Sequence, residues 1–227
     1  MTISDIKPNA NFFPFADTIQ LLNGNGGTLA VFCYCDEATA ESYAAWGVKG
    51  PGWYDYEEYS AWQWDSDIYP KNDYPIPFGT MFVVQSAYEN VALIYAGEVL
   101  PADKEFTITP GVWNMLGNVQ PTDLKIKDIV PNANFFPFAD TIQLLNGNGG
   151  TLAVFCYCDE ATAESYAAWG VKGPGWYDYE EYSAWQWDSD IYPKNDYPIP
   201  AGLGFVVQSA YEGAGIIIPT PLPVQAK

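Results

Sequence analysis

An internal repeat constrains the fold of this chain more than any other feature. Residues 8–77 recur without a single change as residues 131–200, an offset of 131 − 8 = 123 positions. Identity then fades at residues 78–81, although residues 82–89 persist as residues 205–212. Repeats of roughly 20 to 50 residues stack into one continuous core, whereas a unit as long as this one can bury a core of its own. The sequence therefore predicts two tandem modules, over residues 1–100 and 101–227.

The composition predicts a folded, strongly acidic protein. Hydrophobic residues make up 48% of the chain and charged residues 16%, which is too apolar for a disordered segment. Nine lysines oppose 28 acidic residues, and the formal net charge is -19. Such a surface repels nucleic acid and anionic lipid, so cations and neutral glycans remain as possible partners. Other copies of the chain are also expected as partners, on the basis of the repeat edges described below. No apolar stretch reaches the roughly 20 residues of a membrane span, and no signal-peptide pattern is visible. We expect an extracellular or cell-surface location.

Residue patterns within one repeat predict mainly strands and turns. Two β-branched runs, 18–22 and 28–35, flank an Asn-Gly-rich turn and predict a hairpin. Asp36 is a suitable N-cap for a short helix over residues 37–46. We expect one or two short strands within residues 50–77, a turn through residues 122–129, and further strands over 81–87, 91–95, 105–109 and 112–116. The predicted fold class is all-β dominated: two tandem antiparallel β-sandwich or barrel modules with a short helix each.

Four short motifs carry a family resemblance. The motifs are Pro110–Asn118, Ala139–Gln143, Gly175–Tyr177 and Ala201–Phe205. Their order resembles the tandem β-rich repeat modules of secreted bacterial surface proteins, in which a pattern like Gly97-Glu98-Val99 ends the unit. The second copy departs from this pattern, because Thr220-Pro221-Leu222 stands at that position. The resemblance implies a structural or adhesive module with no established chemistry, so it carries over no catalytic residue.

Missing residue types argue against an enzyme. The chain has no histidine, which excludes Ser-His-Asp triads, Cys-His dyads and His-ligated metal sites. All nine cationic residues are lysines, which excludes arginine clamps on phosphate. Only carboxylate chemistry remains, and with 28 acidic residues close carboxylate pairs arise by chance. We therefore predict that the protein is not an enzyme and has no catalytic residues.

The aromatic and acidic run at residues 53–67, repeated at 176–190, allows three interpretations. Alternate rings could pack the core at the two-residue period of a strand. Exposed rings could stack on sugars. Carboxylates could bind Ca²⁺, although the run lacks the glycine and distal glutamate of an EF-hand loop. The candidate Ca²⁺ ligands are Asp65, Asp67, Asp73, Asp188, Asp190 and Asp196. The candidate glycan-stacking residues are Trp53, Trp62, Trp64, Trp176, Trp185 and Trp187.

The four cysteines form two Cys-Tyr-Cys pairs. Cys33 and Cys35 point to the same face of the predicted strand with Cα atoms about 6.6 Å apart, near the upper limit for a disulfide. A bridge to a neighbouring strand, repeat or subunit is easier. Four thiolates could also hold zinc, although zinc ribbons usually place two residues between paired cysteines, and reduced core cysteines are the remaining interpretation. The disulfide candidates are Cys33, Cys35, Cys156 and Cys158.

The edges of the repeat suggest assembly. Copy one has no counterpart of residues 105–123, so the first module is predicted to have an unpaired sheet edge. An apolar tail could add to another subunit as a strand, or could finish its own sheet. The candidate assembly residues in this tail are Ile216, Ile217, Ile218, Leu222 and Val224. The leading prediction is a structural subunit of an extracellular fibre or surface layer that assembles head-to-tail by strand complementation. The alternative is a carbohydrate- or Ca²⁺-binding adhesion module.

Overall fold

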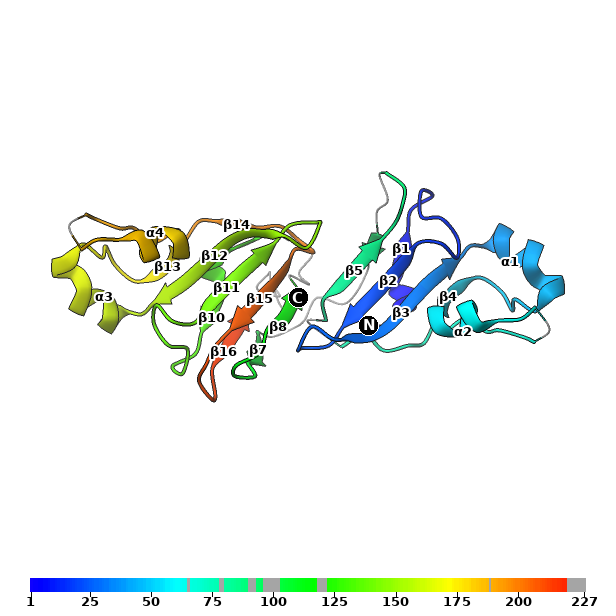
Figure 1. Cartoon of the computed structure of the whole chain (residues 1–227), viewed down its shortest axis with the longest axis horizontal. Coiled ribbons are helices and arrows are strands. Elements are labelled where there is room, and N and C mark those ends of the chain that lie inside the picture. Colours follow the sequence, from blue (N-terminus) through cyan, green and yellow to red (C-terminus); the bar gives the residue numbers. More distant parts are fainter. Residues whose placement is uncertain are drawn as a thin grey trace, which may run out of the picture. The chain divides into compact units, whose positions relative to one another are not determined.

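The computed structural model describes residues 1–64, 66–77, 80–89, 93–95, 103–117, 122–187 and 189–219. The chain divides into two compact units. Unit 1 comprises Met1–Asn23 and Gly27–Glu98, and unit 2 comprises Gly24–Gly26 and Val99–Lys227. Each unit consists mainly of antiparallel strands with a few short helices (Figure 1). The predicted β-dominated architecture is confirmed at this level.

Unit 1 contains one four-stranded antiparallel sheet and one two-stranded sheet. The larger sheet has the order β4-β3-β2-β5, and the smaller one pairs β1 with β6. A 3-10 helix, η1, precedes β1. The bounds of these elements are η1 (Ile3–Asp5), β1 (Ile6–Pro8), β2 (Thr18–Leu22), β3 (Thr28–Cys35), β4 (Gly52–Asp55), β5 (Phe82–Gln85) and β6 (Leu93–Tyr95).

Within the described residues, unit 2 contains counterparts of the unit 1 elements and four further strands. Its main sheet has the order β13-β12-β11-β15-β8, a second sheet has the order β10-β16-β7, and β14 pairs with β9. The strands are β7 (Lys104–Thr107), β8 (Asn114–Gly117), β9 (Leu124–Lys125), β10 (Val130–Pro131), β11 (Thr141–Leu145), β12 (Thr151–Cys158), β13 (Gly175–Asp178), β14 (Pro198–Ile199), β15 (Gly204–Gln208) and β16 (Gly215–Ile218). The 3-10 helix η3 spans Ile126–Asp128.

The predicted hairpin forms with the expected bounds. β2 and β3 pair antiparallel, and the backbone N–H of Asn23 donates to the Gly27 carbonyl at 2.8 Å across the turn. The Asn23 side-chain oxygen accepts from the Gly27 N–H at 2.9 Å, so this side chain ties the turn together. Glycine and asparagine at this point thus specify the register of the central strand pair.

Each unit carries two short helices. In unit 1, α1 (Glu37–Tyr43) begins after Asp36, whose Oδ1 accepts from the Thr39 N–H at 2.7 Å, and continues as η2 (Ala44–Trp46). The predicted helix over residues 37–46 is therefore confirmed, with a 3-10 final turn. A second helix, α2 (Tyr56–Ala61), lies where the sequence predicted strands and loops, because Asp55 caps its N-terminus through two backbone N–H groups. The unit 2 counterparts are α3 (Glu160–Tyr166), η4 (Ala167–Trp169) and α4 (Tyr179–Ala184).

Two apolar clusters form the core of each unit. One lies against the sheet and centres on Trp53 in unit 1, whose indole N–H donates to the Ile6 carbonyl at 3.0 Å. The other lies beneath the helices and contains Cys33, Cys35 and Tyr54. In unit 2 the sheet cluster contains Trp176 and has more buried members, among them Ile108 and Leu116 of the additional segment. None of the helices in the described ranges is long and apolar enough to span a membrane.

Candidate functional site

The clearest difference between the two units lies at one edge of the main sheet. In unit 2, β8 pairs with the outer edge of β15, in a register that places Leu116 opposite Phe205 and Met115 opposite Val206. In unit 1, β5 has the same Phe-Val-Val-Gln sequence as residues 205–208, but no described strand pairs with its outer edge. The repeat alignment predicts an unpaired sheet edge in the first module, and among the described strands of unit 1 the edge strand at this position is β5.

The missing strand changes the exposure of identical side chains. Val206 and Val207 are fully buried, whereas their counterparts Val83 and Val84 are 42% and 39% exposed. Successive side chains of a strand point to opposite faces of the sheet, so both faces of β5 present an apolar residue to solvent. We use the term open edge for the outer edge of β5 at Val83 and Val84.

The segment that covers unit 2 at this position spans residues 104–117. Its two strands do not pair with each other: β7 pairs with β16 in one sheet, and β8 pairs with β15 in the other. Ile108 and Leu116 point into the sheet cluster. The Asn114 side chain donates to the Val207 carbonyl at 3.2 Å and is also held by Thr109. One segment thus closes two sheet edges at once.

The structure corrects the prediction that the tail donates a strand to another subunit. Ile216, Ile217 and Ile218 form β16, which lies between β10 and β7 and uses both of its edges within unit 2. Ile216 and Ile218 are also buried in the sheet cluster. These three residues could join another subunit only by leaving their own sheet, so this part of the tail completes that sheet instead. Leu222 and Val224 lie outside the described residues.

The predicted glycan-stacking tryptophans separate into buried and exposed residues. Trp53 and Trp176 are fully buried core residues and cannot stack on a ligand, so the structure corrects their assignment. Trp62 and Trp185 are largely buried, with an indole N–H bonded to a backbone carbonyl. Only Trp64 and Trp187, each about half exposed, keep the predicted exposure.

The exposed tryptophan of each copy belongs to a cluster that the sequence did not predict. In unit 1 the ring of Trp64 lies 5.1 Å from that of Trp46, 4.6 Å from that of Trp62 and 5.8 Å from that of Tyr43. Trp46 is 51% exposed. These four residues are called the aromatic shelf. Unit 2 has the same arrangement, formed by Tyr166, Trp169, Trp185 and Trp187.

The backbone conformation around Trp46 and Trp64 shapes the shelf. Trp64 has a φ of 63°, a left-handed conformation that bulky residues rarely adopt, and Trp187 repeats it at 66°. Gly47, which directly follows Trp46, has a φ of 110°, and a Cβ at this position would clash with the Ser66 backbone oxygen. Val48 then pairs with Ile68 in a parallel bridge. The close approach at Gly47 therefore brings the segment after η2 against the segment that follows Trp64.

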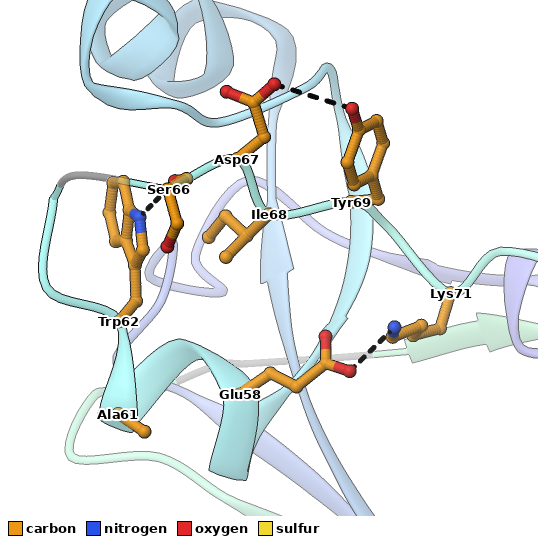
Figure 2. A pocket seen from close by; sticks show the side chains of 8 residues that line it. All are labelled: Glu58, Ala61, Trp62, Ser66, Asp67, Ile68, Tyr69 and Lys71. Carbon is orange, nitrogen blue, oxygen red and sulfur yellow. Dashed lines mark hydrogen bonds and ion pairs between the residues drawn. The ribbon is translucent and has the colours of Figure 1, made fainter.

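A shallow pocket of about 400 Å³ lies next to the shelf in unit 1 (Figure 2). Trp62 forms one side, and its indole N–H donates to the Ser66 carbonyl at 2.8 Å, while Ile68 points between the walls. Glu58 pairs with Lys71 at 2.8 Å. These interactions join helix α2 to the loop that follows it. The residues that line the pocket are Glu58, Ala61, Trp62, Ser66, Asp67, Ile68, Tyr69 and Lys71.

Three of the candidate Ca²⁺ ligands, Asp67, Asp190 and Asp196, form ion pairs with lysines. Asp67 pairs with Lys49 and Asp190 with Lys172, each at 2.8 Å. Asp196 pairs with both Lys125 and Lys127, and these ammonium groups lower its pKa to about 2. Across the described ranges, no three His, Cys, Asp or Glu side chains come together as a metal site. Asp65 and Asp188 lie outside the described residues. Asp73 is described, and Ca²⁺ binding remains a prediction.

The four cysteines are free thiols buried beneath the helices, so the structure does not form the disulfides considered from the sequence. Cys33 and Cys35 lie in one cluster of unit 1, and Cys156 and Cys158 in the matching cluster of unit 2. Burial raises the pKa of all four thiols to about 12. They pack as small apolar residues.

Comparisons with known proteins give no functional assignment. No family model, curated protein or solved structure matches the chain. A function for the protein has to be inferred from the geometry of the open edge and of the two aromatic shelves.

Proposed function

We propose that the protein is a structural subunit that assembles with other copies of itself through the open edge of unit 1. The carrying observation is the exposure of Val83 and Val84, set against the complete burial of the identical Val206 and Val207. An edge strand with exposed apolar side chains is a template for pairing with another chain unless it is covered. Unit 2 supports the proposal, because the same Phe-Val-Val-Gln strand is covered there by a further strand.

The proposed occupant of the open edge is the open edge of a second copy. The 104–117 segment is already paired within unit 2, so it can reach β5 of another copy only by leaving β15 and β16 uncovered. Exposed Val83 and Val84 are best complemented by an equally apolar strand, and β5 of another copy is such a strand. Antiparallel pairing of two identical strands is two-fold symmetric, as in most homodimers. Two four-stranded sheets would then form one continuous sheet.

The proposal includes the architecture of each unit and of the assembly. Each unit is proposed to be one β-sandwich or barrel module, the two modules lie in tandem along the chain, and two-fold pairs of chains are proposed to build a fibre or surface layer. In this proposal, pairing of β5 with β5 takes the place of a head-to-tail contact through the C-terminal tail, because β16 already pairs on both edges within its own sheet. The extracellular location and the fibre form remain predictions from the sequence.

Light scattering coupled to size-exclusion chromatography of the full chain, over a range of concentrations, tests the proposal. The wild type is expected to dimerise with rising concentration. The variant Val83→Lys/Val84→Lys places two charges on an edge that is already exposed, so it is expected to stay folded and monomeric. The matched control is Val130→Lys, a substitution at a valine 48% exposed in unit 2, which is expected to dimerise like the wild type.

Two outcomes would contradict the proposed interface, and one would change its symmetry. A monomeric wild type at every concentration, or a Val83→Lys/Val84→Lys variant that still associates, would overturn the open edge as the interface. Filaments that this variant abolishes would keep the interface and replace two-fold pairing by a head-to-tail contact. A synthetic peptide of residues 104–117 is expected to compete for the edge and to shift the wild type towards monomer.

A further inference from the structure

Each unit carries an aromatic shelf on its surface, formed by residues other than those of the open edge. The shelf of unit 1 exposes two large indoles, Trp46 and Trp64, at 51% and 52%. Burial of aromatic rings is among the strongest contributions to folding, so a pair of half-exposed tryptophans in contact is not what core packing produces. Trp64 is also held in a left-handed backbone conformation. Strain of this kind is concentrated at binding sites.

The geometry of the rings selects among ligand classes. Trp46 and Trp64 are perpendicular, with an interplanar angle of 82°, and their centroids lie 5.1 Å apart. They touch each other, so no space remains between them for a quaternary ammonium group, which aromatic cages enclose between separated rings. The Trp62 and Tyr43 rings lie at 30° and 27° to the Trp64 ring, with centroids 4.6 and 5.8 Å away. Because Trp46 and Trp64 keep about half of their surface exposed, the shelf offers indole surface to a ligand with a flat apolar face.

Charge narrows the ligand further. The chain has a net charge of -19, and the pocket beside the shelf contains the carboxylates Glu58 and Asp67. Anionic ligands such as uronates, sulfated sugars and phosphates would be repelled. A neutral pyranose has a flat face of C–H groups that suits an indole, and hydroxyl groups around its rim that both donate and accept hydrogen bonds.

The adjoining pocket supplies partners for such hydroxyl groups. Trp62 belongs to both features, because it lines the pocket and its ring lies 4.6 Å from that of Trp64. Around the pocket are the ion pair Glu58–Lys71, the carboxylate of Asp67 and the phenol of Tyr69 (Figure 2). The Asp67 carboxylate also pairs with Lys49. An extended sugar chain that stacks one ring on the shelf can reach these groups with the next. Small-molecule sites combine an apolar wall with a few polar groups in this way.

We propose that each aromatic shelf, together with the polar groups beside it, binds a neutral oligosaccharide, so that one chain carries two such sites. The second site contains Trp169 and Trp187, whose rings repeat the contact at 5.1 Å and 83°. Two sites on one chain raise the avidity for a polysaccharide when its length spans both. This proposal is independent of assembly through the open edge, since no residue is shared.

Isothermal titration calorimetry with the full chain and cellohexaose, mannohexaose or maltohexaose tests the proposal, with an oligogalacturonate as the anionic comparison. At least one neutral oligosaccharide is expected to bind with a stoichiometry of two per chain, and the oligogalacturonate is expected not to bind. Trp46→Ala/Trp64→Ala is expected to lower the stoichiometry to one, as is Trp169→Ala/Trp187→Ala. The fourfold variant is expected to bind none. The matched control, Trp113→Ala, removes an equally exposed indole outside both shelves and is expected to retain two sites.

A second measurement keeps the test independent of variant folding. Saturation transfer from aromatic protons of the wild-type protein is expected to reach the C–H protons of the bound sugar. The Val83→Lys/Val84→Lys variant is expected to bind sugar like the wild type, which separates a failure of this proposal from a failure of assembly. Absence of binding to all three neutral oligosaccharides would overturn the proposal, as would binding that the folded fourfold variant retains.

Discussion

Val84 and Val207 occupy the same position in two copies of one strand sequence, yet Val207 is fully buried and Val84 is 39% exposed. The difference does not arise from the strand itself, because residues 82–89 and 205–212 are identical. In unit 2, residues 104–117 cover β15, whereas no described strand covers the outer edge of β5. The two valines therefore compare one strand sequence in two surroundings, and the pairing of β8 with β15 is one difference between them.

The first prediction concerns this pair. Val207→Ala is expected to lower the free energy of unfolding of unit 2 by about 2 kcal/mol, because a buried valine loses its packing, and Val84→Ala is expected to cost under about 1 kcal/mol. Urea unfolding followed by tryptophan fluorescence, at a protein concentration low enough to keep the chain monomeric, provides the measurement. Equal losses in the two variants would contradict the exposure of β5.

The second prediction concerns Gly47 and Gly50, which both have strongly positive φ angles. Alanine at Gly50 would meet no other atom within 4 Å, so Gly50→Ala is expected to cost only the conformational strain, about 1–2 kcal/mol. Alanine at Gly47 would in addition clash with the Ser66 backbone, and the loss is expected to exceed about 3 kcal/mol. Urea midpoints of the two variants, compared with the wild type, decide the matter. A Gly47→Ala variant as stable as Gly50→Ala would show that the two segments do not approach closely.

The third prediction concerns the thiols. Burial raises the pKa of Cys33 and Cys156 to about 12, and only the thiolate is nucleophilic. At mildly alkaline pH the native protein is expected to resist iodoacetamide, whereas the protein unfolded in guanidinium should be alkylated at all four cysteines. Intact mass spectrometry counts the adducts. Rapid alkylation of the native chain, or four cysteines protected after unfolding without reductant, would contradict the buried free thiols.

The fourth prediction concerns acid stability. Lys127 and Lys125 lower the pKa of Asp196 from 3.8 to about 2. A lowered pKa in the folded state means that the contribution to stability is present above about pH 4 and is lost as the pH falls towards 2. The wild type is therefore expected to melt slightly above Asp196→Asn near neutral pH, with the difference vanishing at low pH and shrinking in high salt.

Copy one supplies the control for this prediction. Asp73 stands at the position of Asp196, but Thr2 and Ser4 replace the two lysines. Asp73→Asn is expected to leave the melting temperature closer to that of the wild type across the same range. Calorimetry of both variants over pH provides the comparison, and a larger effect of Asp73→Asn would contradict the role of the lysine pair.

Local patterns predicted much of the fold. The hairpin formed by β2 and β3 follows from β-branched runs about an Asn-Gly turn, and α1 follows from Asp36 and an alanine-rich stretch. Helix α2 was missed, because Tyr56–Ala61 is short and lies in a segment crowded with Gly, Pro, Trp, Tyr and Asp, in which the Asp55 cap is the main local sign of a helix. The separation of β7 and β8 into different sheets could not be predicted either, since a turn between two strands usually joins neighbours.

Some of the candidate sites could be predicted from the sequence and others could not. The open edge followed from comparing the ends of the repeat, which requires no three-dimensional information. The tail was assigned wrongly, because its apolar pattern is the same whether Ile216 and Ile218 pair within unit 2 or outside it. Trp46 was missed because it lies at the end of a helix, 18 positions before Trp64 (64 − 46), and only the approach at Gly47 brings the two together.

The identity of β5 and β15 also matters while the chain is being made. During synthesis β5 leaves the ribosome first, then β8, and β15 later. When β8 emerges, the first copy therefore already offers a Phe-Val-Val-Gln strand and the second copy does not yet do so. The shorter connection between Gln85 and Asn114 also makes closure of that loop cheaper in entropy than closure to Gly204. The native pairing of β8 with β15 must therefore prevail over an earlier, equivalent competitor. The order of synthesis therefore favours pairing of β8 with β5 before β15 exists, and folding must avoid or reverse that pairing to reach the native sheet.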